Sequence, residues 1–399
     1  MSFMPNTREE LVDTLLTRGV ERVYPDKETV RKALLGEKPL TFFLGIDPTG
    51  PNLHIGHGAT LLKLRRLQRL GHKIILLIGG FTATIGDPTD KKATRVKLTH
   101  EEVLENAANY ETQAGKVLDM ANVELRNNSD WYVKMSFAEV LELASEFTTA
   151  QLLERDMFQE RMKAGDPIYF HEMFYPMMQG YDSVAMDVDG ELGGNDQTFN
   201  MLAGRTMLKK RGKEKFVIAG KLLVDPTGRK MGKSEGNMIT LGDASSDMYG
   251  KVMSWPDVLL EDGYELFTDL DMDSVRNEIA IDPKLAKMKL AREIVTTFAG
   301  TEEGEAAEHD FVQTFQEGGI PEDTKTHMAK EGEALLDILL EEGLVPSKAS
   351  FRRLVDEGGV RVLDEAGVEI RRVRAPDECL SASLIVRVGK RRFLRIVLR

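Results

Sequence analysis

The sequence predicts an α/β protein whose main domain holds a doubly wound parallel sheet, followed by a helical domain and a small α+β domain. Between residues 40 and 240, apolar strand-like runs alternate with helix-like runs, an order typical of parallel sheets. Residues 241–326 are polar and helix-like, and a stretch rich in Gly, Pro, Glu and Asp closes them. From about residue 335 a helical start gives way to short alternating strands. These observations predict domains at 1–240, 241–326 and 335–399, and a length of 399 residues fits two or three domains.

The main domain is expected to begin with strand, helix and strand. Its expected strands are short apolar runs at residues 41–46, 73–78, 184–188 and 216–224. A helix from about His57 to Leu70 follows the first strand after a Pro- and Gly-rich turn, and a long helical insertion is expected at about 97–185. Ligands of such sheets bind at the carboxyl ends of the strands. Side chains that directly follow these runs are therefore candidates for a binding site.

The rest of the chain is predicted from periodicity and breaker residues. Pro283 starts a strongly periodic helix over 284–298, and residues 317–326 have the composition of a linker. The expected elements of the tail are a helix at 329–342, the segment 347–354, a turn at Gly358 and Gly359, and strands at 360–363, 384–388 and 392–397.

Composition excludes several classes of protein. Apolar and charged residues make up 42% and 30% of the chain, as in soluble globular proteins, and the apolar runs are too short to span a bilayer. The first residues lack both a basic and an apolar segment, so we expect no secretion signal, a cytoplasmic location and no membrane partner. The single cysteine, Cys379, excludes an internal disulfide framework and a cysteine-built zinc site.

Charge is distributed unevenly along the chain. The net charge is −12, but residues 348–399 hold 13 Lys or Arg and 7 Asp or Glu, a local +6, so residues 1–347 carry −18. A basic tail on an acidic body indicates a module that binds a polyanion. The alternative is a basic, solvated face without a ligand.

His54 and His57, in His-Ile-Gly-His, come directly after the first expected strand and its turn and open the expected helix. A helix start offers free N–H groups and the positive end of the helix dipole, both of which favour phosphate. The two imidazoles can donate to phosphate oxygens, and Gly56 lets a flat ligand approach the backbone. The alternatives are a pair that satisfies itself in a turn, or a metal site, for which no third ligand lies nearby in the sequence.

Lys230, Lys233 and Ser234 lie in Lys-Met-Gly-Lys-Ser after a second turn. Two lysines and a hydroxyl on a small loop suit a charge clamp around a pyrophosphate leaving group. A Walker loop is the alternative, but it needs four residues between its glycines, and here there are three. Alone, this segment would be interpreted as a basic surface turn.

The two segments together resemble the HIGH and KMSKS motifs of class I aminoacyl-tRNA synthetases. Segments that begin at Phe43, Ile85, Gln179 and Glu191 resemble bacterial tyrosyl-tRNA synthetases at matching intervals, over nearly the whole chain. The resemblance implies a Rossmann-like catalytic domain, a dimer surface on the insertion, an anticodon-side helical domain and an S4-like RNA-binding tail. The implied partners are tRNA(Tyr), L-tyrosine, ATP and a second copy of the chain.

Tyr175, Gln179 and Asp182 are spaced so that a helix places them on one face. Their sequence neighbours are largely apolar, so this polar stripe is expected to face a cavity instead of solvent. Under the resemblance, Asp182 accepts the hydrogen bond of the tyrosine phenol, and Asp87 lies with Tyr175 and Gln179 around the α-ammonium group.

The resemblance assigns the remaining site residues. Charge stabilisation is expected from His54, His57, Lys230, Lys233 and Ser234, with Thr49 assisting. Nucleotide contacts are expected from Gly45, Asp47, Gly56, Lys91, Arg95, Gly194 and Asp196; Lys91 and Arg95 could instead form a solvated basic patch, and the glycines near Gly194 a strand bulge. Tyrosine contacts are expected from Phe43, Asp87, Tyr175, Gln179, Asp182 and Gln197. RNA contacts are expected from Arg352, Arg353, Lys390, Arg391 and Arg392.

Phe43 departs from the family pattern. The family carries a tyrosine at this position, and that tyrosine also contacts the substrate phenol. With Phe43, Asp182 would discriminate tyrosine from phenylalanine with one polar contact fewer.

The implied reaction has two steps, in which tyrosine attacks the α-phosphate of ATP and the terminal ribose of tRNA then attacks the acyl carbon. No protein nucleophile is required, so catalysis is positioning and charge stabilisation. Mg²⁺ is expected to accompany ATP without a protein cage, and no structural metal is expected. Two alternatives are a tryptophanyl-type synthetase and a nonenzymatic RNA-binding paralogue.

Overall fold

The computed structural model describes residues 7–89, 98–224, 238–315, 320, 324–364, 367–389 and 392–399. The chain divides into two compact units: unit 1 comprises Met1–Asp243 and Trp255–Phe298, and unit 2 comprises Ala244–Ser254 and Ala299–Arg399. Across the described residues, every helix is too short or too polar to cross a membrane.

Unit 1 is built on a six-stranded sheet with the order β1-β6-β5-β2-β3-β4. Its strands are β1 (Val20–Tyr24), β2 (Thr41–Ile46), β3 (Lys73–Ile78), β4 (Val123–Asn127), β5 (Gly190–Gly194) and β6 (Phe216–Gly220). Strands β2 to β6 pair in parallel, which confirms the parallel sheet. The prediction is corrected at one edge, where β1 pairs antiparallel with β6.

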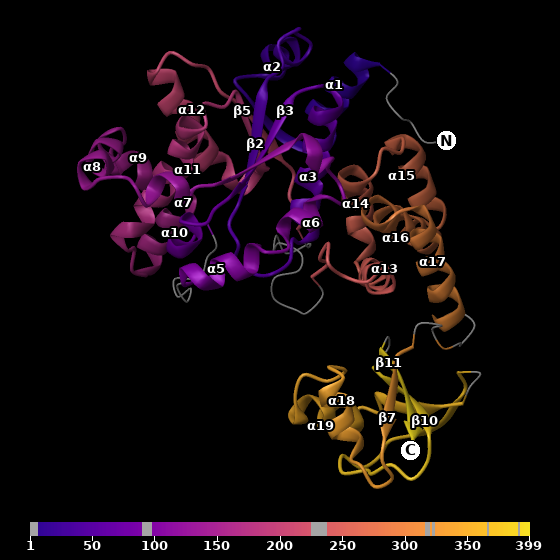
Figure 1. The fold of residues 1–399 in the computed structure, drawn as a ribbon. Coiled ribbons are helices and arrows are strands. Elements are labelled where there is room, and N and C mark those ends of the chain that lie inside the picture. The colour runs from indigo at the N-terminus through magenta and orange to yellow at the C-terminus, as the bar shows by residue number, and fades with distance from the viewer. Residues whose placement is uncertain are drawn as a thin grey trace. The chain divides into compact units, whose positions relative to one another are not determined.

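Helices cover both faces of this sheet, as a doubly wound fold requires. In Figure 1, α1 (Arg8–Thr17) and α3 (Ile55–Arg69) lie on one side, and α11 (Phe174–Ala185) and α12 (Thr198–Lys210) lie on the other. Helix α3 contacts β3 and β5, and α12 contacts β5 and β6 and packs along α11. The carboxyl ends of β2 and β5, which lie side by side, therefore open between α3 and α11.

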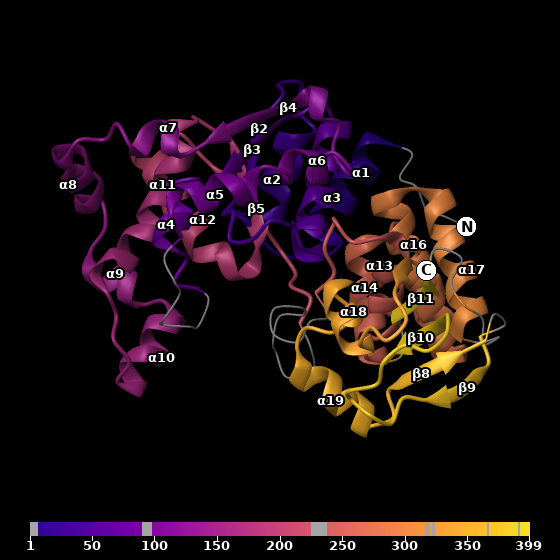
Figure 2. The same cartoon turned by 60° about the horizontal axis from the view of Figure 1, so that its bottom comes forward.

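The remaining helices of unit 1 are mostly short. They are α2 (Lys27–Leu34), α4 (Thr82–Ile85), α5 (His100–Ala107), α6 (Tyr110–Ala114), α7 (Ser129–Tyr132), α8 (Phe137–Ser145), α9 (Thr149–Leu153), α10 (Asp156–Ala164), α14 (Leu260–Phe267), α15 (Met272–Ile281) and α16 (Pro283–Ala299), with 3₁₀ turns at Met120–Asn122, Phe170–Met173, Asn195–Gln197 and Asp257–Leu259. Figure 2 shows α8, α9 and α10 extending away from the sheet at one end of the unit. Capping boxes start three of these helices, at Thr99, Ser136 and Thr148.

Two predictions within unit 1 were wrong. The insertion at about 97–185 is not wholly helical, because it contributes β4, which pairs with β3. The apolar run at 184–188 is no strand: it ends α11 and turns at Asp187, whose φ is +48°. The strand follows at Gly190–Gly194. Three of its five residues are glycine, which is rare in strands, so residue propensity does not predict it.

Unit 2 begins with two helices, α13 (Ser245–Met253) and α17 (Thr301–Phe315). They pack together, and the rings of Tyr249 and Phe311 lie 5.2 Å apart. Unit 2 therefore takes α13 and α17 from the predicted helical domain at 241–326, while α14, α15 and α16 belong to unit 1.

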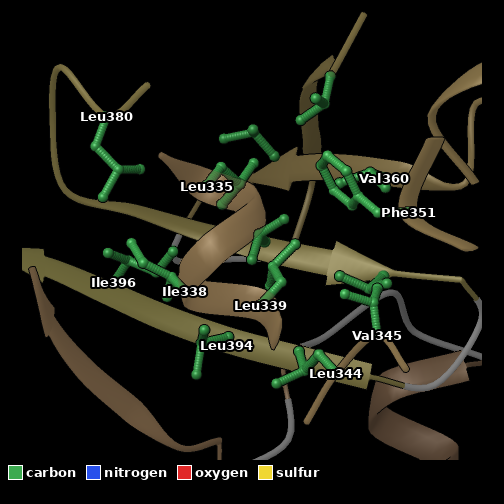
Figure 3. Packing of buried hydrophobic residues seen from close by; sticks show 14 of the residues in the cluster. Leu335, Ile338, Leu339, Leu344, Val345, Phe351, Val360, Leu380, Leu394 and Ile396 are labelled. Atoms are coloured by element: carbon green, nitrogen blue, oxygen red, sulfur yellow. The ribbon is translucent and has the colours of Figure 1, made fainter. Parts of the chain in front are cut away.

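A five-stranded mixed sheet with two helices forms the rest of unit 2. Its strands are β7 (Thr326–Ala329), β8 (Val360–Leu363), β9 (Glu369–Arg372), β10 (Leu384–Val388) and β11 (Arg392–Leu398), in the order β7-β11-β10-β8-β9. Helices α18 (Leu335–Glu341) and α19 (Lys348–Asp356) pack on it, with Leu335, Leu339 and Phe351 in the core that Figure 3 shows. The helix predicted over 329–342 is thus shorter, and its first residue belongs to β7.

Candidate functional site

A cavity of about 240 Å³ opens in unit 1 at the carboxyl ends of β2 and β5. It brings together many residues that the sequence singled out, namely Phe43, Gly45, Asp47, Thr49, His54, Gly56, His57, Asp87, Tyr175, Gln179, Asp182, Gly194, Asp196 and Gln197. The predicted Lys91, Arg95, Lys230, Lys233, Ser234, Lys390 and Arg391 lie outside the described residues. Two parts of the cavity differ in construction, one beside α3 and one beside α11.

The α3 side of the cavity is formed by His54, Gly56 and His57 at the start of α3. His54 is the N-cap: its Nδ1 accepts from the backbone N–H of His57, while Nδ1 of His57 accepts from the N–H of His54, both at 3.3 Å. The rings stack with centroids 3.7 Å apart. A Cβ at position 56 would meet the His54 ring at 3.0 Å, so glycine permits this stacking. The two imidazoles and the helix N-terminus thus face one place where an anion is favoured.

The chain on the far side of residues 225–237 returns beside this helix start. The backbone N–H of Ile55 donates to the carbonyl of Ile239 at 2.9 Å, and that of Leu241 donates to the carbonyl of Leu53 at 2.8 Å. His54 and Thr240 form the bridge between the two segments. The histidine segment and the chain that follows the predicted lysine loop are therefore held together by backbone hydrogen bonds.

Gly194 ends β5 and allows a close turn. A Cβ there would lie 2.5 Å from Oδ1 of Asp196 and 2.7 Å from Leu222. A larger residue here would require Asp196 or Leu222 to shift, so glycine suits this turn. Gly45 is different, because a Cβ there would make only ordinary contacts, the nearest at 3.8 Å.

Asp47 holds the α11 side of the cavity to β2. Its Oδ2 accepts from the hydroxyl of Tyr175 at 2.8 Å, and its Oδ1 accepts from the hydroxyl of Thr82 at 2.7 Å. Burial raises the pKa of Tyr175 well above its usual range, so this hydroxyl remains a donor. Asp47 thus has a structural task in addition to the predicted nucleotide contact.

Asp87 is fixed by donors from three directions. Gln197 donates to its Oδ2 at 2.6 Å, and the backbone N–H and hydroxyl of Thr89 donate to its Oδ1 at 2.9 and 2.7 Å. The buried Arg155 donates to the Thr89 hydroxyl at 2.7 Å and lies 4.0 Å from Asp87. Gln197 in turn accepts from Asn200 at 2.9 Å. Asp87 and Gln197, predicted separately, therefore form one hydrogen-bonded pair.

Asp182 is 3% exposed and accepts hydrogen bonds from three side chains that the sequence did not single out. The Tyr132 hydroxyl and the Trp131 Nε1 donate to its Oδ1 at 2.8 and 3.0 Å, and Asn128 donates to its Oδ2 at 3.3 Å. Burial raises the pKa of Asp182 to about 8, and the three donors act in the opposite direction. These three donors follow β4. Because the sequence did not predict β4, it also did not predict that they would lie near Asp182.

Glu191 and Lys215 form a buried ion pair behind Gln179, which the sequence did not indicate. Lys215 Nζ donates to Oε2 of Glu191, to the Ser183 hydroxyl at 2.7 Å and to the Met201 carbonyl at 3.0 Å. Gln179 Nε2 donates to Oε1 of Glu191 at 2.9 Å.

Phe43 is fully buried among Ile75, Leu77 and Val188, and its ring centroid lies 5.5 Å from Lys215 Nζ. Phe43 is therefore part of the cavity wall and also contacts the buried cation.

The predicted RNA residues occupy the small domain of unit 2. Arg352 and Arg353 are exposed on α19, and Nε of Arg353 lies 3.9 Å from Glu357. Arg392 donates to the carbonyl of Leu344, so it has a contact within the domain. Among the described residues, no three His, Cys, Asp or Glu side chains gather as a metal site.

Comparison with known proteins shows the family to which the chain belongs. Residues 35–316 match the model of "tRNA synthetases class I (W and Y)". The chain is 42% identical to the tyrosine–tRNA ligase of Carboxydothermus hydrogenoformans, over 96% of this chain and 97% of the relative. It is also 42% identical to that of Thermotoga maritima, over 98% of each. Among solved structures, a C-terminally truncated mitochondrial tyrosyl-tRNA synthetase of Coccidioides posadasii matches with a TM-score of 0.62 and 27% identity, over 75% of this chain and 91% of that one.

Proposed function

The chain belongs to the class I tRNA synthetases of the tryptophan and tyrosine type and is a tyrosine–tRNA ligase, and from this premise we propose how its residues divide the reaction. Its substrates are tyrosine, ATP and tRNA(Tyr). One observation carries the assignment of residues: a single cavity has a buried, three-donor carboxylate at Asp182 and a histidine-capped helix start at His54.

The α11 side of the cavity binds tyrosine. Asp182 accepts the hydrogen bond of the phenol, because its carboxylate lines the cavity and its own donors hold it in place. The α-ammonium group of tyrosine is bound by oxygens of Asp87, Tyr175 and Gln179. Gln197 lies near the carboxylate of the tyrosine substrate. A tryptophan side chain would present an N–H at a different distance, and the full-length relatives are tyrosine ligases.

The α3 side of the cavity binds the phosphates of ATP. His54 and His57 donate to phosphate oxygens at the helix start, with Thr49 beside them. The ribose and adenine are held by Gly45, Asp47, Gly56, Gly194 and Asp196. Lys91, Arg95, Lys230, Lys233 and Ser234 complete this set as cationic and hydroxyl donors.

The first step forms tyrosyl-adenylate. A tyrosine carboxylate oxygen bonds to the α-phosphorus, and the bond to the bridging oxygen of pyrophosphate breaks. The chain supplies no nucleophile; it aligns the two substrates and stabilises charge on the phosphates. In the second step a ribose hydroxyl of tRNA attacks the acyl carbon and AMP leaves.

Mg²⁺ fits this site only as a companion of ATP. Hard oxygen ligands suit Mg²⁺, and it commonly binds through substrate phosphates with few protein carboxylates. When bound, Mg²⁺ neutralises phosphate charge, a task it shares with the histidines.

The chain works as a homodimer through its insertion. The insertion exposes several large apolar side chains, namely Val133, Phe137, Leu141, Tyr169 and Phe170, with Phe137 76% and Phe170 73% exposed. Large exposed apolar patches mark protein interfaces. Analytical ultracentrifugation of the wild type and of Phe137→Lys tests this proposal. We expect the wild type to be a dimer and the variant to have a higher dimer dissociation constant. A monomeric wild type at micromolar concentration would refute the proposal.

The basic domain of unit 2 binds tRNA through phosphate contacts. Arg352 and Arg353 are exposed on one helix, α19, as such contacts require. Arg352→Gln with Arg353→Gln should lower the salt slope of tRNA binding by about two units. An unchanged slope would show that α19 is only a solvated surface.

ATP–pyrophosphate exchange with each amino acid tests the whole proposal. Tyrosine should support exchange, and the purified chain should then charge tRNA(Tyr). Exchange with tryptophan instead would overturn the amino-acid assignment, and RNA binding without exchange with any amino acid would favour a nonenzymatic role.

A further inference from the structure

The buried Glu191–Lys215 pair is unused by the reaction as described above. Lys215 is 0% and Glu191 1% exposed. The three N–H groups of the lysine meet three acceptors: Oε2 of Glu191, Oγ of Ser183 and the carbonyl of Met201. Buried ion pairs can often be replaced by apolar residues without loss of stability, so stability alone does not account for this one.

The pair reaches the tyrosine pocket through Gln179. Nε2 of Gln179 donates to Oε1 of Glu191 at 2.9 Å, and both side chains line the cavity. An ionised carboxylate only accepts hydrogen bonds, whereas an amide has one donating and one accepting end. Glu191 therefore selects one of the two amide orientations of Gln179 and leaves its Oε1 for another donor.

We propose that Glu191, held in place by Lys215, is a positioning residue that turns the amide oxygen of Gln179 toward the α-ammonium group of tyrosine. This inference rests on the proposed contact between Gln179 and that group. An ammonium group only donates, so the reversed amide would bring donor against donor. Lys215 contributes because it occupies Oε2 of Glu191 and so leaves Oε1 to Gln179.

Glu191→Gln is the decisive variant, since it keeps the shape of the side chain and an acceptor for Lys215 while presenting an N–H to Gln179. The Kd for tyrosine should rise about tenfold or more, the value of a hydrogen bond to a charged group. The Kd for phenylalanine should rise by the same factor, because both amino acids carry the ammonium group. In the exchange reaction, KM for tyrosine should rise more than kcat falls.

The double variant Glu191→Gln with Gln179→Glu provides the rescue test. The new amide at position 191 then donates to a carboxylate at position 179, which again offers an oxygen to the ammonium group. Most of the lost affinity should return, which a purely structural role of the pair would not produce. A double variant as weak as Glu191→Gln alone would overturn the inference.

Ser183→Ala is the matched control. It removes one acceptor of Lys215 and leaves the hydrogen bond between Gln179 and Glu191 intact. We expect a lower melting temperature and an unchanged Kd for tyrosine. If this control weakened tyrosine as much as Glu191→Gln does, the pair would act through packing and the inference would be wrong.

Two further variants keep the outcomes distinct. Gln179→Ala tests the proposed contact itself: an unchanged Kd would refute that contact, whereas a raised Kd together with an unaffected Glu191→Gln variant would refute only the positioning role. If Glu191→Gln proves too unstable to measure, Glu191→Gln with Lys215→Met removes both buried charges and should show the same loss of affinity. Wild-type affinity in that variant would overturn the inference.

Discussion

The α3 side and the α11 side of the cavity are built in different ways. On the α3 side, His54, Gly56 and His57 are neighbours in sequence, and the helix start sets the contact between the two imidazoles. On the α11 side, Asp182 depends on donors at least 50 positions earlier in the chain, such as Trp131 and Tyr132 at 51 and 50 residues. The first side offers donors for charge that develops during the reaction; the second presents acceptors that are fixed before the substrate arrives.

This difference predicts that the two sides control different kinetic constants. Changes on the α3 side should act on kcat, because stabilisation there is strongest in the transition state. Changes on the α11 side should act on tyrosine affinity and on the choice between amino acids.

The largest effect is expected from His57→Ala. Loss of one preorganised donor to the phosphates should lower kcat of adenylate formation about 10²- to 10³-fold, while the Kd of tyrosine stays constant. Stopped-flow measurement of adenylate formation gives both constants. His57 also closes the capping box of α3, because its Nδ1 accepts from the N–H of His54. His57→Gln, which can keep that hydrogen bond from the third position of the helix, therefore serves as the control. A variant that lost tyrosine affinity but kept its rate would break the comparison.

Asp182→Asn should have the next largest effect. It replaces a carboxyl oxygen that accepts hydrogen bonds by an amide among three donors. The activation free energy for tyrosine should therefore rise by about 1–3 kcal/mol, with a matching fall in kcat/KM. Phenylalanine has no phenol and should lose little, so the ratio of the two kcat/KM values should decrease. Exchange assays with both amino acids measure it, and an equal loss for both would remove Asp182 from the phenol end.

Much of the α3 side could be predicted from sequence, because β2, β3 and α3 follow local periodicity and His54 and His57 stand at a recognisable helix start. The motif residues of the α11 side were also predicted, but their partners were not. Trp131 reaches Asp182 only because β4 joins the sheet beside β3. Lys215 meets Glu191 only because β5 and β6 pair in register. Such contacts depend on pairing between distant segments, which a single sequence does not encode locally.

Phe43→Tyr should give a smaller change. Phe43 is fully buried, lines the cavity and contacts Lys215 through its ring face, a contact that a tyrosine ring can keep. An added hydroxyl near the phenol should widen discrimination against phenylalanine by about 1 kcal/mol, one ordinary hydrogen bond. The ratio of kcat/KM values tests this, and an unchanged ratio would mean that position 43 does not reach the phenol.

The last prediction concerns the pH dependence of stability instead of catalysis. Burial raises the pKa of Asp182 to about 8 from 3.8, so the folded chain holds a proton that the unfolded chain releases. The contribution of this group to the free energy of unfolding is greatest at low pH and falls as pH rises toward about 8. Urea unfolding between about pH 5 and pH 8 gives the free energy of unfolding of the wild type and of Asp182→Asn. The wild-type value minus the variant value should decline as pH rises. A constant difference would mean that the three donors keep Asp182 charged throughout.

Strand β4 stands at the edge of the sheet in the order of strands, paired only with β3 among the described residues. Edge strands open locally at a lower free energy than central ones, and here the donors to Asp182 follow directly from that edge. Opening of β4 would withdraw Asn128, Trp131 and Tyr132 from Asp182 together. If tyrosine binds only when these donors hold Asp182 in place, it stabilises the closed form of β4. The free energy of opening then rises by RT ln(1 + [L]/Kd), where [L] is the free tyrosine concentration and Kd its dissociation constant. Tyrosine thereby stabilises the edge strand β4, and the concentration of free tyrosine determines how often that strand opens locally.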